Sequence, residues 1–212
     1  MPTLPHLHAH HGDFTTFRDL MAETAVARFG PIWWGVWEQL VAVRDPCTVV
    51  DLGTGPGVML RGLRARLPRS RLIGVDVQPV MLEAARAGGA EVGAEIVEAD
   101  LAMRTTLPDG VADVVTAVHL FHEMEFPPAL LDEARRLLRP GGVLVLYDWV
   151  KKPLAEYLEA HELDEAHFQR FREHCLFTLQ DLEWLVARAG FTLRESVGRR
   201  GGRYVIVVAE KA

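Results

Sequence analysis

The chain has 212 residues, of which 49% are apolar and 25% are charged, and its net charge is −6. This composition is that of a soluble globular domain, and it excludes a disordered chain, a collagen-like fibre and a coiled coil. No apolar run reaches the roughly 18 residues of a membrane span, and the N-terminus lacks the pattern of a signal peptide. The acidic balance argues against a general attraction to nucleic acid or anionic membranes. The two distant cysteines, Cys47 and Cys175, fit a cytoplasmic location.

Residues 1–45 are expected to form a helical cap. Asp13 is a good N-cap residue, apolar residues follow it at helical spacing, and Gly30-Pro31 ends this first helix. A second helix follows and carries three tryptophans, Trp33, Trp34 and Trp37. A tryptophan stripe suits either an aromatic acceptor pocket or packing against the rest of the protein, and both interpretations stay open here.

Residues 46–149 alternate short apolar runs with amphipathic stretches. The runs expected to be strands are Thr48–Leu52, Arg71–Asp76, Glu95–Asp100, Asp113–Val118 and Val143–Asp148. Helical patterns lie between them near residues 57–67, 79–87 and 127–139. Four of the runs are rich in Val, Ile or Leu, which is typical of strands buried on both faces. The alternation therefore predicts βαβ units with right-handed crossovers and a parallel sheet.

The last part of the chain is expected to be helical and then to form two strands. Residues 150–176 form a helical cover, and Thr178 with Asp181 resembles a capping box at the start of a helix that ends near Gly190. The two expected strands are Phe191–Ser196 and Tyr204–Ala209. The basic turn between them is interpreted as a solvated hairpin tip.

A glycine-rich loop follows the first expected strand, in the run Asp51-Leu52-Gly53-Thr54-Gly55-Pro56-Gly57. Glycines allow positive φ angles and a close approach of the backbone to a ligand. The run lacks the Gly-Lys-Ser/Thr of a Walker A loop, and Val58 stands where a dinucleotide fingerprint has its last glycine. Because Asp51 would repel a pyrophosphate and the loop has no basic residue, the pattern favours a positively charged ligand.

The run from Asp51 to Gly57 resembles motif I of the class I S-adenosylmethionine-dependent methyltransferases. Five later segments resemble further parts of that family in the same order, namely Ile73–Asp76, Glu98–Leu101, Ala112–Met124, Leu137–Leu144 and Phe177–Phe191. The resemblance covers roughly residues 46–209, and it makes residues 46–212 a Rossmann-like methyltransferase domain. It implies a doubly wound α/β fold with a seven-stranded sheet in the order 3-2-1-4-5-7-6, mostly parallel with an antiparallel last strand. An N-terminal helical lid is expected to cover that domain.

The same resemblance implies that S-adenosylmethionine is the cofactor, bound across the carboxyl ends of the first and fourth strands. The implied cofactor residues are Asp51, Gly53, Thr54, Gly55, Gly57, Asp76, Val77, Asp100, Leu101 and His119. Asp76 would hold the ribose hydroxyls, and Asp100 would meet the adenine amino group. Asp76 lies 19 residues after Gly57, close to the roughly 20-residue spacing of a ribose-binding acid.

Methyl transfer is an in-line displacement, so the protein must align the acceptor, exclude water and, where needed, remove a proton. His122 and Glu123 fall where relatives bring acceptor and cofactor together, and an imidazole can take a proton near neutral pH. His122 is therefore the first candidate base and His119 the second. The alternative is that one of them lines the cofactor pocket and the other makes a structural hydrogen bond, and Glu123 could cap or orient. Asp148 would lie on the opposite rim, where it suits a cationic acceptor or is an ordinary loop acid. Cys47 is expected in the core.

The sequence thus predicts methyl transfer to a small-molecule acceptor. The alternatives are a methyltransferase for protein or RNA and a catalytically silent S-adenosylmethionine-binding module, because fold alone does not determine function. No membrane or metal partner is expected, nucleic acid is disfavoured, and a homodimer stays open. The N-terminal histidines, His6, His8, His10 and His11, could bind a transition metal, but a solvated terminus is the favoured interpretation. Three later histidines, His161, His167 and His174, are interpreted as surface residues.

Overall fold

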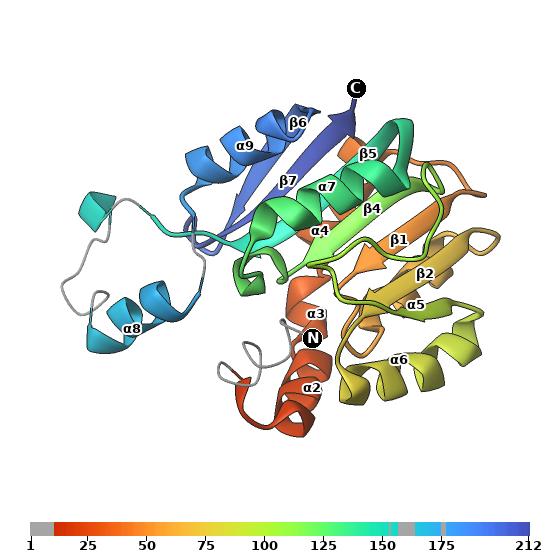
Figure 1. Cartoon of the computed structure of the whole chain (residues 1–212), viewed down its shortest axis with the longest axis horizontal. Helices are drawn as coiled ribbons and strands as arrows, with labels where there is room; N and C mark the ends of the chain where they lie inside the picture. The colour runs from red at the N-terminus through yellow and green to blue at the C-terminus, as the bar shows by residue number, and fades with distance from the viewer. Residues whose placement is uncertain (1–10, 153, 157–163, 175–176) are drawn as a thin grey trace.

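The computed structural model describes residues 11–152, 154–156, 164–174 and 177–212, and its centre is a seven-stranded sheet (Figure 1). The strands are β1 (Thr48–Leu52), β2 (Arg71–Asp76), β3 (Glu95–Glu98), β4 (Ala112–Val118), β5 (Leu138–Trp149), β6 (Phe191–Arg199) and β7 (Tyr204–Lys211). Their order is β3-β2-β1-β4-β5-β7-β6, as expected. Neighbouring strands from β3 to β5 pair in parallel, and β7 runs antiparallel to both β5 and β6. The expected fold class is therefore confirmed.

Helices cover both faces of this sheet. The described helical elements are α2 (Phe14–Glu23), α3 (Ala25–Arg28), α4 (Pro31–Val36), η1 (Trp37–Val41), α5 (Val58–Arg66), α6 (Pro79–Val92), η2 (Phe121–Glu123), α7 (Pro127–Leu137), η3 (Leu154–Glu156), α8 (Glu165–Glu173) and α9 (Leu179–Arg188). Apolar residues of α7 and α9 pack on one face, and those of α4, η1 and α5 pack on the other. Within the described residues, no helix is long and apolar enough to cross a membrane.

Local sequence signals account for several element boundaries. Asp13 caps α2, because its carboxylate accepts hydrogen bonds from the backbone of Thr15 and Thr16. Thr178 and Asp181 form the expected capping box at the start of α9. The single helix expected before Gly30 is instead divided at Thr24, whose hydroxyl donates to the carbonyl of Leu20.

Strand β5 begins earlier than the apolar pattern predicts. We expected it from Val143, whereas it starts at Leu138, which pairs with Ala112 of β4. The register shifts between Ala112 and Val114, so an irregular segment rich in glycine joins the ladder before the apolar run begins. The start of β5 is therefore set by its pairing with β4, and a hydropathy pattern carries no information about that pairing.

The three tryptophans lie against the sheet. Trp33 and Trp37 are buried in the same apolar cluster as residues of β1, β5 and α5, and Trp33 stacks on Tyr147 with ring centroids 5.8 Å apart. Trp34 is half-buried, and the guanidinium of Arg66 lies 3.6 Å from its ring centroid. These contacts make the tryptophan helix part of the core.

The packing of Trp33 predicts a large loss of stability when that side chain is removed. Trp33 is 1% exposed, so we expect Trp33→Ala to lower the free energy of unfolding by about 3–5 kcal/mol. Trp34→Ala is the matched control, and because Trp34 is only half-buried its loss should be clearly smaller. Urea unfolding of both variants checks the difference, and equal losses would contradict the burial argument.

Candidate functional site

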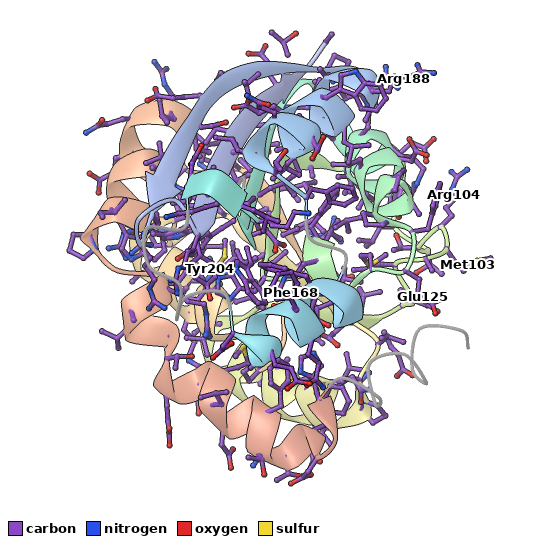
Figure 2. All side chains as sticks on the ribbon, turned by 90° about the vertical axis from the view of Figure 1, so that its left-hand side faces the viewer. Met103, Arg104, Glu125, Phe168, Arg188 and Tyr204 are labelled. Atoms are coloured by element: carbon purple, nitrogen blue, oxygen red, sulfur yellow. The ribbon has the colours of Figure 1, made fainter. Side chains whose placement is uncertain are left out.

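A cavity lies at the carboxyl ends of β1, β2 and β4. Its lining residues are His11, Phe14, Phe17, Met21, Gly53, Gly55, Asp76, Val77, Gln78, Met81, Ala99, Leu101, Val118, His119, Leu120, Glu123 and Met124. Phe14, Phe17 and Met21 come from α2, so this helix forms one wall of the cavity. Figure 2 shows α8 with Phe168 in front of this edge of the molecule and α2 below it.

The glycine-rich loop between β1 and α5 forms the floor of the cavity. Gly55 has a φ of +54°, and its N–H donates to Oδ2 of Asp76 at 2.8 Å. A Cβ on Gly55 would meet no atom within 4 Å, because this position borders the open space of the cavity. A side chain there would occupy the space available to a ligand, so the loop is shaped to let a ligand reach the backbone.

Asp76 joins this loop to the end of β2. Its Oδ1 accepts hydrogen bonds from the backbone N–H groups of Val77 at 2.8 Å and Gln78 at 2.9 Å, in addition to the bond from Gly55. Burial raises the pKa of Asp76, and these three donors oppose that shift. A carboxylate has about four acceptor positions, so Asp76 keeps room for one more hydrogen bond from a ligand.

Gln78 is a site residue that the sequence analysis missed. Its side chain is 3% exposed and lines the cavity, and among the described residues its Nε2 has no hydrogen-bond partner. An orphaned buried amide beside a cavity is a donor prepared for a ligand. Its position two residues after the acid that ends β2 is the signal that could have identified it.

Asp51 lies beneath the glycine-rich loop and does not line the cavity. It is 2% exposed, and the hydroxyl of Thr116 donates to its Oδ1 at 2.7 Å. Burial raises the pKa of Asp51 to about 6; the Thr116 hydrogen bond opposes this shift, and the nearby charge of Asp76 adds to it. A ligand that brings positive charge toward the loop would favour the ionised form.

The ten expected cofactor residues divide into two groups, according to whether they line the cavity. Six of the ten line the cavity, namely Gly53, Gly55, Asp76, Val77, Leu101 and His119. Four lie behind this lining, namely Asp51, Thr54, Gly57 and Asp100. Asp100 accepts a hydrogen bond from the backbone of Ala102 at 3.0 Å, and its neighbours Ala99 and Leu101 supply the wall of the cavity.

His119 faces the cavity from the end of β4. Its φ is +54°, an uncommon value for a residue other than glycine, and its N–H donates to the carbonyl of Tyr147 at 2.7 Å. Its ring stacks on Tyr204 at 5.2 Å. Burial lowers the pKa of His119 to about 4, so the imidazole is neutral at pH 7. Within the described structure, its buried Nε2 has no hydrogen-bond partner.

His122 sits between two carboxylates and does not line the cavity. Its Nδ1 lies 2.5 Å from Oδ1 of Asp148, and its Nε2 lies 3.0 Å from Oε1 of Glu123. Burial alone would lower the pKa of His122, but the two carboxylates outweigh burial and raise it to about 10. Because both ring nitrogens are engaged, the geometry does not support the expected role of His122 as a base.

Asp148 does not form the exposed rim that the sequence suggested. It is 1% exposed, and its carboxylate accepts hydrogen bonds from the backbone of Leu120, Phe121 and Trp149 as well as facing His122. These four partners compensate its buried charge. Asp148 therefore holds the loop after β4 and is not available to a cationic acceptor.

Two histidines interpreted as solvated residues instead reach Glu123. His11 Nε2 lies 3.1 Å from Oε2 of Glu123, and the His11 ring stacks on Phe17 at 4.0 Å. His174 Nδ1 lies 3.6 Å from Oε1 of Glu123. Burial would raise the pKa of Glu123, but hydrogen bonds from His11 and His122 hold it well below its usual range.

Some residues named in the sequence analysis lie outside the described part of the chain, namely His6, His8, His10, His161 and Cys175.

The tryptophan stripe is absent from the lining of this cavity. Its residues face the opposite layer of the fold, where they cover β1 and β5. The expectation of an aromatic acceptor pocket built from Trp33, Trp34 and Trp37 therefore does not match the geometry. Aromatic side chains reach the cavity from α2 instead, as Phe14 and Phe17.

Comparison with known proteins agrees with this geometry. Residues 12–196 match the family described as the methyltransferase domain, and the chain belongs to this family, within the class I S-adenosylmethionine-dependent methyltransferases. S-adenosylmethionine is accordingly its cofactor.

Curated relatives match part of the chain. A trans-aconitate 2-methyltransferase of Azoarcus sp. (strain BH72) is 40% identical over 106 residues, which cover 50% of this chain and 40% of that protein. A demethylmenaquinone methyltransferase of Thermus thermophilus is 34% identical over 116 residues, which cover 54% of this chain and 52% of that protein. The matched segments thus span about half of these relatives or less.

Among solved structures, an S-adenosylmethionine-dependent methyltransferase from Aquifex aeolicus superposes with a TM-score of 0.71 at 21% identity. The superposition covers 94% of this chain and 99% of that one. The similarity shows that the two chains share the fold.

The raised pKa of Asp51 makes the stability of the ligand-free protein depend on pH. Between about pH 4 and pH 6 the carboxyl is protonated in the folded chain and ionised in the unfolded chain, so stability falls as pH rises through this window. Asp51→Asn cannot ionise and still offers an oxygen to Thr116. We expect its stability relative to the native protein to improve by about 1–1.5 kcal/mol between about pH 5 and about pH 7.5.

Urea unfolding at the two pH values checks this expectation. The control is Glu98→Gln, which neutralises an exposed acid at the end of β3, the edge strand beyond β2. The raised pKa of Asp51 would be contradicted if the stability of Asp51→Asn relative to the native protein were the same at both pH values. It would also be contradicted if this relative stability changed equally for Asp51→Asn and Glu98→Gln.

Proposed function

We propose that this protein transfers the methyl group of S-adenosylmethionine to a small-molecule acceptor. The observation that carries the proposal is the position of the cavity, which adjoins the glycine-rich loop and Asp76 and is covered by α2. The walls that α2 and the loop after β4 contribute are largely apolar, with Phe14, Phe17, Leu120 and Met124. Such a covered cavity suits a small and partly apolar acceptor.

The residues at the loop fit this cofactor. The open space beside Gly55, the remaining acceptor capacity of Asp76 and the orphaned amide of Gln78 suit a ligand that carries hydroxyl groups. The ionisable Asp51 beneath the loop suits a ligand with positive charge. When bound, S-adenosylmethionine supplies a methyl group that its sulfonium makes electrophilic.

The contribution of the chain is to align the acceptor and to exclude water. The aromatic side chains of α2 form one wall of the cavity and limit its exposure to water. His119 and His11 both line the cavity, and the neutral ring of His119 can exchange a hydrogen bond with an acceptor or with the cofactor. His122 orients Glu123 through a direct contact, so we assign it a positioning role.

The alternatives account less well for the site. A protein or RNA substrate would favour a broad basic groove, whereas the basic turn between β6 and β7 is partly used within the fold. Arg199 donates to the carbonyl of Arg28 at 3.0 Å and lies 5.3 Å from the ring centroid of Tyr147. A silent binding module would be favoured by a degraded loop or a lost acid, and both Gly55 and Asp76 are present. The names of the two relatives, which refer to trans-aconitate and demethylmenaquinone, also favour a small acceptor.

Release of S-adenosylhomocysteine across a metabolite panel tests the proposal. The panel should contain small carboxylic acids, phenols and quinols, together with an unrelated protein and RNA as comparison substrates. We expect turnover with at least one small molecule and none with the macromolecules. Cofactor binding by calorimetry without turnover on any substrate would instead support the silent module.

Replacement of Asp76 tests the proposed ribose contact. A hydrogen bond to a charged acceptor contributes about 1.5–3 kcal/mol, so we expect Asp76→Ala to weaken S-adenosylhomocysteine binding by at least ~10-fold. Asp76→Asn retains one oxygen for the backbone donors and separates loss of charge from loss of loop structure. Glu98→Ala, which removes the exposed acid that ends β3, is the control and should bind normally. Unchanged calorimetric affinity in folded Asp76→Ala would remove Asp76 from the cofactor site.

A further inference from the structure

Three segments that are distant in sequence converge on the carboxylate of Glu123. His11 precedes α2, His122 and Glu123 belong to η2 after β4, and His174 follows α8. Donor atoms of His122, Glu123 and His174 all lie within 4.8 Å of one another. His11 approaches the other oxygen of the same carboxylate. The proposed methyl transfer gives the His122–Glu123 contact a positioning role and leaves the contacts of His11 and His174 with Glu123 without a function.

The spacing of these atoms is that of donors around a metal ion. In a tetrahedral site with metal–nitrogen distances of ~2.0–2.1 Å, neighbouring donor atoms are ~3.3 Å apart. The distances from the Glu123 oxygens are 3.0 Å to His122 Nε2, 3.6 Å to His174 Nδ1 and 3.1 Å to His11 Nε2. The separations of Glu123 Oε1 from the nitrogens of His122 and His174 are thus close to those in a tetrahedral site, with His11 on the second oxygen of the same carboxylate.

Asp148 supplies the outer contact that metal-binding histidines commonly have. A ligating imidazole usually directs its second nitrogen to a carboxylate, which sets its orientation and raises its basicity. His122 does this with Nδ1, 2.5 Å from Asp148, and directs Nε2 toward Glu123. Backbone donors from Phe121 and Trp149 in turn hold the Asp148 carboxylate in place.

We propose that Glu123, His122 and His174 bind one divalent transition-metal ion, with His11 as a fourth donor. Imidazole with a single carboxylate suits zinc and its neighbours better than magnesium or calcium, which prefer sites built from oxygen atoms. The charge is also balanced, because the carboxylates of Glu123 and Asp148 together match a divalent cation. Zn²⁺ is therefore the ion we expect to bind most readily.

Such an ion would connect the cover of the cavity to its wall. Glu123 and His11 both line the cavity, so the ion would lie at its boundary. His11 would tie the start of α2, and His174 the segment after α8, to the loop that follows β4. Metal binding would thus fix α2 as a wall of the cavity and attach the end of α8 to the loop after β4, and this role does not depend on the reaction that occurs inside.

Metal titration of the full chain tests the proposal without an activity measurement. After treatment with a chelator and its removal, Zn²⁺ is added and followed by calorimetry, and elemental analysis gives the bound amount. We expect a single ion per chain. Glu123→Gln and His174→Ala should each weaken binding by more than the ~10–100-fold that loss of an outer-shell partner costs. Circular dichroism confirms that the variants are folded, and His174→Ala alters only a half-buried residue outside the sheet.

The matched control removes three other N-terminal histidines together, His6→Ala, His8→Ala and His10→Ala, because clustered imidazoles at a terminus also bind metals. This triple variant should keep the ion. Visible absorption of bound Co²⁺ adds a spectroscopic readout, which should be lost in Glu123→Gln and kept in the triple variant. Metal that is lost only in the triple variant would overturn the proposal. Absence of stoichiometric metal from the native chain would also overturn it and would leave Glu123 as the centre of a hydrogen-bonded histidine cluster.

Discussion

The buried carboxylate of Asp148 at the end of β5 determines where the loop after β4 lies. It accepts hydrogen bonds from the backbone of Leu120 and Phe121 and contacts the His122 ring. Because a buried charge without partners is costly, this loop cannot move away without leaving Asp148 unsatisfied. The positive φ of His119, which turns its ring toward the cavity, and the presentation of Glu123 at the cavity wall both occur within the segment that Asp148 holds.

Much of the fold was predictable because its determinants are local or periodic. The bounds of β1 and β2 follow from short runs rich in Val, Leu and Ile with an acid at or next to the last residue, Asp51 in β1 and Asp76 in β2, and the α9 capping box follows from residues three positions apart. The glycine-rich loop and the acid at the end of β2 are each recognisable locally, although Gly55 and Asp76 lie 21 residues apart. Parallel strands bring their carboxyl ends to one edge, so these two signals converge there, and the contact between Gly55 and Asp76 results.

The remaining features depend on contacts that no local pattern reports. Asp148, the partner of His122, lies 26 residues away on β5, beyond the crossover helix α7, so no local spacing joins the two residues. His174 and His11 reach Glu123 from segments without a strong apolar period, so sequence reasoning left them in solvent. For the segment α4–η1, which carries the three tryptophans, the spacing showed an apolar face but not which side of the sheet that face covers. Tyr147 of β5, which stacks on Trp33, settles that choice.

The position of α4 and η1 has a consequence for how this chain can be divided. Trp33, Trp37 and Val41 lie in one apolar cluster with Val49 of β1 and Val145 of β5. Arg194 of β6 also donates to the carbonyl of Leu40 at 2.8 Å. A fragment beginning at residue 46 would expose the apolar face of the sheet that α4 and η1 cover. We therefore expect such a fragment to aggregate rather than to fold as a domain without its cap. A stable shortened form would have to keep the chain from about Ala25 onward, because Arg199 donates to the carbonyl of Arg28 in α3. This leaves α2 as the segment that protein engineers can exchange.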